Sequence, residues 1–182
     1  VTTVETTGGN SGKGKPNSKP DKPGKNQPAL NILDHILREL IGEGTNGKSD
    51  MLTLLKEGRN VAALERIEKS IRLLEQFEKL TGIDTSKIQG QLTLIAQYIN
   101  RLLIEEAQKT VLATEPKPSD LAKIEKAWSA FEEGVTSASS GEYQEAAHDF
   151  KVSVASVMKF KPQVEIGTPI INWVSGPEAT TQ

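Results

Sequence analysis

One stretch of the chain has the residue types and spacing of a phosphate-binding loop. Residues 42–49 read Gly-Glu-Gly-Thr-Asn-Gly-Lys-Ser, which is two glycines separated by four residues and followed by Lys48 and Ser49. In a working loop, backbone N–H groups hold the phosphates, Lys48 reaches the terminal phosphates and Ser49 binds Mg²⁺. Such a loop follows a buried parallel strand, but residues 30–41 have helical spacing, and no later apolar run ends in Asp. We therefore interpret residues 42–49 as a Gly/Asn-rich loop between helices.

The other candidate chemical groups are two histidines, each next to a carboxylate. His35 follows Asp34 and His148 precedes Asp149, so each pair could act as a base or contribute to a metal site. The pairs lie far apart in the sequence and lack metal-ligand spacing, so we interpret them as solvated or partly buried helix residues. Paired acids such as Glu132-Glu133 diverge by about 100° on a helix and are expected to be solvated. The sequence predicts no enzyme, no catalytic residue, no cofactor and no metal ligand.

The composition indicates that these groups are carried by aliphatic helices. The chain has 182 residues, of which 36% are hydrophobic and only 4% aromatic, so one domain would have a core of Leu, Ile, Val and Ala. The absence of cysteine excludes disulfides and thiolate metal sites. No apolar run approaches the ~20 residues needed to cross a bilayer, and we predict no membrane span.

Helical spacing of apolar residues predicts a bundle of four to six helices between residues 29 and 161. Gly82, after the third predicted helix, and Gly141, between the last two, are expected to end helices, because glycine adopts the left-handed conformation easily. The first three predicted helices cover about residues 29–41, a short segment from the cap residue Ser49 to Lys56, and Val61 to Leu80. The fourth is a long helix that is capped by Asp84 or Thr85 and ends near Ala113. The last two begin at Ser119 and run from Tyr143 to Met158, respectively.

The apolar positions of these helices are expected to face the core and the charged positions to face water. In the first helix this assigns Leu30, Leu33, Ile36, Leu37 and Leu40 to the core, and Asp34, Arg38 and Glu39 to the surface. In the later helices the expected core includes Met51, Leu52, Leu55, Leu80, Ile88 and Leu121.

The two ends of the chain differ in composition from the helical part. Residues 1–28 carry five lysines against two acids, a net charge of +3, which leaves −5 for the rest of a chain of net charge −2. We interpret residues 1–28 as a flexible Lys/Pro/Gly-rich arm that could contact cell-wall polyanions, and residues 162–182 as an extended tail able to form a short strand. The candidate contact residues in these β-prone ends are Val1, Val4, Ile170, Ile171, Trp173 and Val174.

The end of the helical part resembles a tetratricopeptide-like hairpin. The segments 128–134 and 141–147 carry it, with Gly141 at the turn. The side chains expected at the helix crossing are Trp128, Phe131, Tyr143, Ala146, Ala147 and Phe150. A longer stretch, about residues 60–160, resembles the helical C-terminal regions of large secreted bacterial and archaeal proteins, including proteases and surface proteins. The resemblance assigns no chemistry to any residue.

These observations predict a non-enzymatic extracellular accessory or interaction domain of a surface or secreted protein, with protein partners and no nucleic acid. One alternative is a self-assembling structural subunit of a filament or matrix, whose β-prone ends pair with neighbouring copies as added strands. The second alternative is a nucleotide-binding protein that uses residues 42–49. Since the chain begins at Val1 without an initiator Met or a signal sequence, we expect a mature chain or a fragment.

Overall fold

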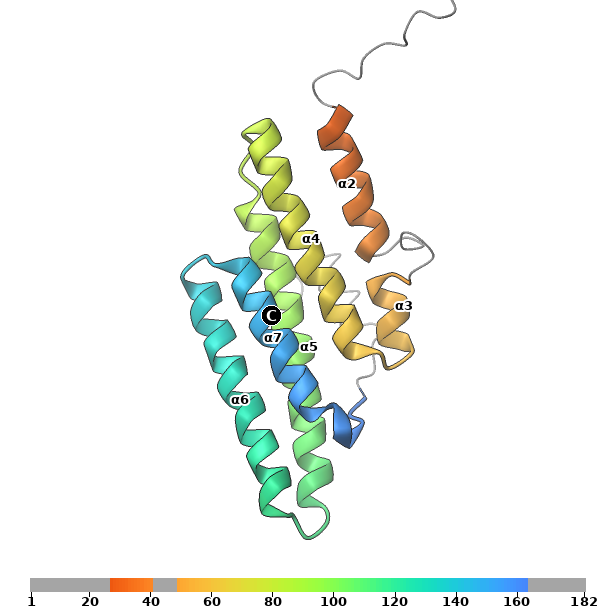
Figure 1. The fold of residues 1–182 in the computed structure, drawn as a ribbon, viewed down its shortest axis with the longest axis vertical. Helices are drawn as coiled ribbons and strands as arrows, with labels where there is room; N and C mark the ends of the chain where they lie inside the picture. Colours follow the sequence, from red (N-terminus) through yellow and green to blue (C-terminus); the bar gives the residue numbers. More distant parts are fainter. Residues whose placement is uncertain (1–26, 41–48, 164–182) are drawn as a thin grey trace, which may run out of the picture.

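The computed structural model describes residues 27–40 and 49–163, and in these ranges six α-helices pack into a bundle without any strand (Figure 1). The elements are α2 (Gln27–Leu40), α3 (Met51–Lys56), α4 (Asn60–Thr81), α5 (Ser86–Leu112), α6 (Pro118–Ser139), α7 (Tyr143–Val157) and a short 3₁₀ turn, η2 (Met158–Phe160). The predicted all-α bundle is confirmed. In the parts of the chain with described structure, no helix has the length and apolarity needed to span a membrane.

The helix α7 lies at the centre of the bundle and contacts α4, α5 and α6. Helices α6 and α7 form an antiparallel hairpin against α5, as Figure 1 shows in teal, blue and green. The helix α2 runs antiparallel to α4 and contacts, among the described helices, only α3 and α4. Among the described helices, α2 is therefore attached to the bundle mainly through α4, with a smaller contact to α3.

Local sequence signals explain where most helices end. Gly82 has φ +75° and ends α4, and Gly141 has φ +79° in the turn between α6 and α7, so both predicted glycine stops are confirmed. The cap of α3 differs from the prediction. Asp50, rather than Ser49, accepts a hydrogen bond from the backbone N–H of Thr53 at 2.8 Å, because Asp50 has the extended backbone of a cap residue.

The buried residues form two aliphatic clusters. The larger cluster joins α2, α3, α4, α5 as far as Leu103, and most of α7, and the smaller cluster lies between the end of α5, the first half of α6 and the end of α7. The buried members of the smaller cluster are Ile104, Ala107, Val111, Ile124, Ala127 and Val157. A core built from Leu, Ile, Val and Ala is what the composition predicts, and Phe150 is its largest fully buried side chain.

The α6–α7 hairpin packs closely because small residues line the crossing. Ala146 and Ala147 are buried, and Gly134 lies directly against the ring of Phe150. The rings of Phe131 and Phe150 have centroids 5.7 Å apart. Tyr143 differs from the expectation, since its ring packs on Gly90 of α5 and lines a groove beside the crossing.

Several apolar side chains expected in the core are exposed. Leu30 and Leu37 of α2 are 55% and 57% exposed, because Ala29, Ile36 and Glu39 form the inner side of that helix. Other predicted core residues with exposed side chains are Leu80, Ile88 and Leu121. In α3 the buried side chains are those of Met51, Leu54 and Leu55, whereas Leu52 is half-buried.

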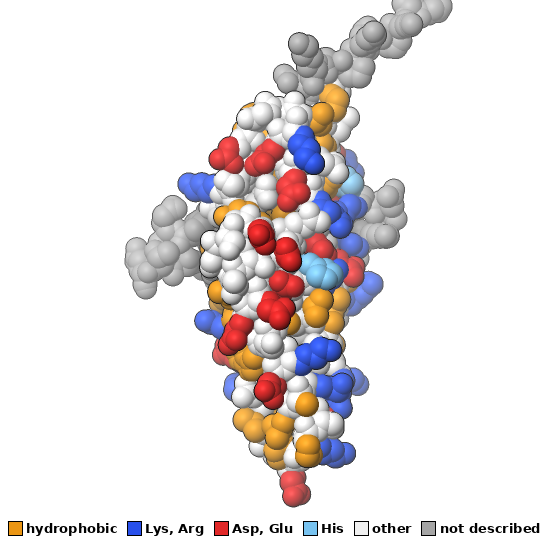
Figure 2. All heavy atoms as spheres, turned by 60° about the vertical axis from the view of Figure 1, so that its left-hand side comes forward, with side chains coloured by type: hydrophobic (Ala, Val, Ile, Leu, Met, Phe, Trp, Pro, Cys, Tyr) orange, Lys and Arg blue, Asp and Glu red, His pale blue; other side chains and the backbone are white. Residues whose placement is uncertain are grey.

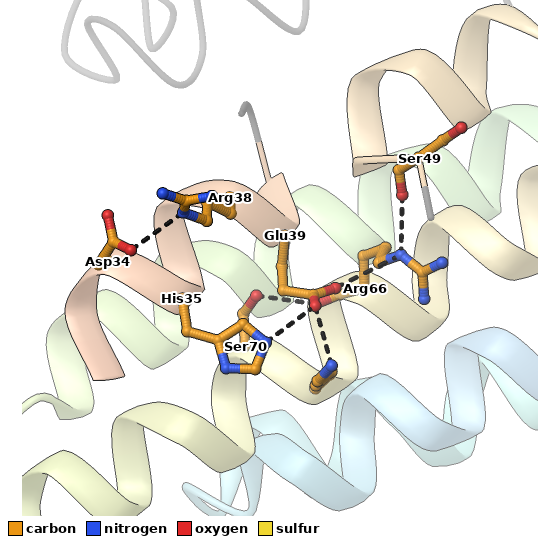
Figure 3. Close-up of polar contacts among 8 residues, drawn as sticks. Asp34, His35, Arg38, Glu39, Ser49, Arg66 and Ser70 are labelled. Carbon is orange, nitrogen blue, oxygen red and sulfur yellow. Dashed lines mark hydrogen bonds and ion pairs between the residues drawn. The ribbon is translucent and has the colours of Figure 1, made fainter. Parts of the chain in front are cut away.

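A buried carboxylate attaches α2 to α4, which the sequence analysis did not predict. Glu39 is 1% exposed. The Nζ of Lys69 donates to its Oε1 at 2.8 Å, and the Nε of Arg66 lies 3.4 Å from its Oε2. Figure 3 shows His35 and Arg66 pointing toward Glu39, while Asp34 and Arg38 pair on the outer side of α2. The expectation that Glu39 faces water is therefore wrong.

Candidate protein-binding face

Two adjacent open hollows meet at the start of α7. The first has a volume of about 540 Å³ and lies between α4 and α7, where its lining includes Glu75, Glu142 and Glu145. The second has a volume of about 450 Å³ and lies between α6 and α7. Glu145 lines both hollows, so they form one continuous surface. We call its carboxylates the acidic face, namely Glu75, Glu132, Glu133, Glu142, Glu145 and Asp149.

The fold of the hairpin brings these carboxylates together. Gly141 reverses the chain between α6 and α7, which places Glu142 at the beginning of α7. Glu145 and Asp149 are four residues apart and therefore lie on the same side of α7. Across the hairpin, Ser137 of α6 lies 3.4 Å from Asp149, from its Oγ to the carboxylate Oδ2. The acidic face is thus assembled from α4, α6 and α7, which are separated in the sequence.

The acidic face concentrates negative charge. Within the described part of the chain, none of its six carboxylates forms an ion pair. The pKa of Asp149 is raised above its ordinary value, first by burial and then by the negative charges of Glu133 and Glu145. His148 and the hydrogen bond from Ser137 oppose this shift. Figure 2 shows acidic side chains over the middle of one face, with basic side chains mainly along one edge.

Glu68 lies beside this face but differs from it electrostatically. The Nζ of Lys151 donates to Glu68 Oε1 at 2.8 Å, and Nδ1 of His148 lies 3.3 Å from Oε2. Glu68 is also nearly buried, at 8% exposure. It therefore joins α4 to α7 and leaves the outer carboxylates as the accessible negative charges.

A third hollow on the other side of Tyr143 is almost uncharged. It has a volume of about 520 Å³ and lies between α5 and the α6–α7 hairpin. Leu94, Val135 and Tyr143 supply much of its apolar surface, and among the described residues Lys87 is the one charged side chain in its lining. The acidic face and this groove thus differ strongly in character, although Tyr143 lines both.

The two predicted histidine pairs do not form a common site. His35 lies 3.2 Å from Glu39, and His148 contacts Glu68, so each histidine pairs with a glutamate rather than with its neighbouring aspartate. In the ranges that the structure describes, no group of three or more His, Asp or Glu residues could hold a metal ion.

The residues predicted to make contacts lie outside the described structure. These residues are Val1, Val4, Ile170, Ile171, Trp173 and Val174, and the same is true of positions 42–48 in the phosphate-loop pattern. Ser49 is described, and its backbone carbonyl accepts a hydrogen bond from Arg66 at 3.0 Å. The structure therefore leaves the strand-pairing and nucleotide-binding hypotheses as predictions.

Sequence reasoning missed the acidic face because it treated each acidic run separately. Glu132-Glu133 was expected to be a solvated face of one helix, and both side chains are indeed exposed. The available signal was the predicted hairpin itself, since folding the 128–134 segment onto the 141–147 segment brings acids from both helices to one surface. Much of the negative charge of the site therefore arises from the packing of α6 against α7, and neither helix alone shows it.

The chain was compared with known proteins at the levels of family, sequence and structure. No family model, no curated protein and no solved structure matches it. The resemblance of residues 60–160 to helical C-terminal regions of secreted proteins therefore stays a prediction, and a functional proposal has to be built on the acidic face.

Proposed function

We propose that this chain is a non-enzymatic interaction domain, an extracellular accessory part of a surface or secreted protein, which binds a Lys- or Arg-rich segment of a partner protein. The observation that carries the proposal is the set of six carboxylates around two joined hollows, none of them ion-paired in the described residues. A basic segment would neutralise this face and relieve the repulsion from Glu133 and Glu145 that, after burial, raises the pKa of Asp149.

The expected binding is weak and depends on salt. Exposed ion pairs contribute about 0.2–1 kcal/mol each, so six carboxylates supply roughly 1–6 kcal/mol. This free energy corresponds to a dissociation constant of about 40 μM or weaker. Because the screening length falls from ~10 Å at 0.1 M salt to ~3 Å at 1 M, added salt should weaken binding strongly.

The arm of the same chain has the chemistry of such a ligand. Residues 13–25 contain five lysines and one aspartate. An external basic peptide would then compete with these lysines for the acidic face. The same lysines are the predicted contact for cell-wall polyanions, so the two kinds of binding would exclude each other.

The proposal is tested by titrating the full chain with a labelled deca-lysine peptide and measuring fluorescence anisotropy. The site variant combines Glu142→Gln, Glu145→Gln and Asp149→Asn. The matched control combines Glu65→Gln, Glu115→Gln and Glu125→Gln, which are exposed carboxylates outside the acidic face and remove the same charge. Three pairs at about 0.2–1 kcal/mol each correspond to roughly 3- to 150-fold in affinity, and we expect the site variant to bind more weakly than the control by a factor in this range.

Equal losses in the two variants would mean that the peptide responds only to net charge, and the proposal would be wrong. A further full-length variant changes the five lysines of residues 13–25 to glutamine. If the arm competes for the acidic face, this variant binds the peptide more tightly than the wild type does. Deca-glutamate serves as the negative control peptide for all variants.

A further inference from the structure

One buried polar side chain interrupts the apolar core. Asn100 of α5 is 0% exposed. Within the described structure, neither its Nδ2 nor its Oδ1 has a hydrogen-bond partner. A buried amide without partners loses its hydration and gains nothing in return, so this position opposes folding.

Asn100 lies near the boundary between the two core clusters, which on α5 falls between Leu103 of the larger cluster and Ile104 of the smaller one. Along its stripe of α5, Ala96 is four residues earlier and belongs to the larger cluster. Ile104 and Ala107, four and seven residues later, belong to the smaller cluster. On this stripe of α5, the amide of Asn100 therefore stands between an apolar side chain of the larger cluster and one of the smaller cluster.

The same boundary appears on the neighbouring helix α7. Val154 belongs to the larger cluster and Val157 to the smaller one. On α6, Phe131 is the one partly buried side chain in the described residues that packs against both clusters. The two clusters therefore share little apolar surface.

We infer that the bundle consists of two cooperative units and that the smaller cluster opens while the larger one stays folded. The smaller unit comprises the end of α5, the first half of α6 and the end of α7. Opening restores water to the amide of Asn100, which favours opening at this boundary. Local opening of this kind follows the limits of buried clusters in other small proteins. The inference is independent of the proposed binding function.

The test is native-state hydrogen exchange of the full chain, measured amide by amide by NMR. We expect the amides of residues 104–111 to have protection factors at least about tenfold lower than those of residues 92–99. Equal protection in the two halves of α5 would overturn the inference.

A variant in the larger cluster provides the sharper test. Ile71→Val removes one methyl from a fully buried position of that cluster and should lower the protection of the larger unit roughly twofold to tenfold. Protection of residues 104–111 should stay unchanged, because their opening leaves Ile71 packed. A parallel decrease in both units would mean that the bundle opens as a whole and would overturn the inference.

The role of Asn100 itself is tested by Asn100→Leu. The leucine should join the two clusters, so the ratio of protection between the units should move toward one. An unchanged ratio would show that the amide does not set the boundary. If the leucine disturbs the packing, the Ile71→Val variant still tests whether the bundle has two units, because that variant keeps Asn100.

Discussion

Gly134 is expected to be the glycine of the bundle that tolerates a side chain least. A Cβ at this position would lie 2.5 Å from Cε1 and 2.7 Å from Cδ1 of Phe150. Phe150 is fully buried, and its ring contacts Phe131, so it has no free space into which to move. The clash in Gly134→Ala falls at the upper end of overpacking, about 3 kcal/mol.

The higher helix propensity of alanine offsets part of this cost. Replacing a helical glycine by alanine stabilises a helix by about 1 kcal/mol. The net effect of Gly134→Ala is then a destabilisation of about 2 kcal/mol, or roughly 5–8 °C in melting temperature for a domain of this size. The measurements are thermal melting by circular dichroism and urea denaturation at neutral pH.

Gly90→Ala is the matched control, because Gly90 is also inside a helix. The nearest atom to its added Cβ is the hydroxyl oxygen of Tyr143, at 3.3 Å. Tyr143 is only half-buried and lines open hollows, so its ring can shift by a few tenths of an ångström. We expect Gly90→Ala to stabilise the protein by about 0.5–1 kcal/mol. If Gly134→Ala were as stable as Gly90→Ala, the close approach of α6 and α7 would be refuted.

Three further changes have defined outcomes. Glu39→Gln leaves the ammonium of Lys69 without its buried anion and should cost about 2–3 kcal/mol, seen as early exchange of the α2 amides. Ser153→Ala removes a 2.6 Å hydrogen bond to the carbonyl of Ala127 and should lower the free energy of unfolding by about 1 kcal/mol. Because folding raises the pKa of Asp149, its stabilising contribution is present below an ordinary aspartate pKa of ~3.9 and is lost as pH rises through the folded pKa. Asp149→Asn should therefore be more stable than the wild type at pH 7, and chemical denaturation should show this difference shrinking as the pH falls through the raised pKa of Asp149 toward ~3.9.

The helical architecture could be predicted because its signals are local. The glycines at 82 and 141 end helices through their own backbone preferences, and the long aliphatic seam of α4 needs a core whatever its neighbours are. The exposure of Leu30 and Leu37 could not be predicted in the same way. It depends on how α2 is rotated against α4, and this rotation is fixed by contacts with residues more than 25 positions away, such as that between Glu39 and Lys69.

The candidate site illustrates the same difference. The acids at 132, 133, 142, 145 and 149 are plain in the sequence, but their accumulation on one surface requires the hairpin and the tight crossing at Gly134. Sequence alone also gives no reason to expect a buried amide at Asn100, since asparagine inside an amphipathic helix is normally assigned to the solvent side.

The buried carboxylate of Glu39 fixes the position of α2 along the axis of α4. The inner side chains of α2, such as Ala29 and Ile36, are small or aliphatic and would pack acceptably after a shift of one helical turn. Such a shift moves Glu39 by about 5.4 Å, away from the ammonium of Lys69 and the guanidinium of Arg66, and takes a buried carboxylate away from both cations. The apolar contacts hold α2 on the bundle, and the ion pairs of Glu39 with Lys69 and Arg66 favour one alignment of α2 along α4 over its shifted alternatives.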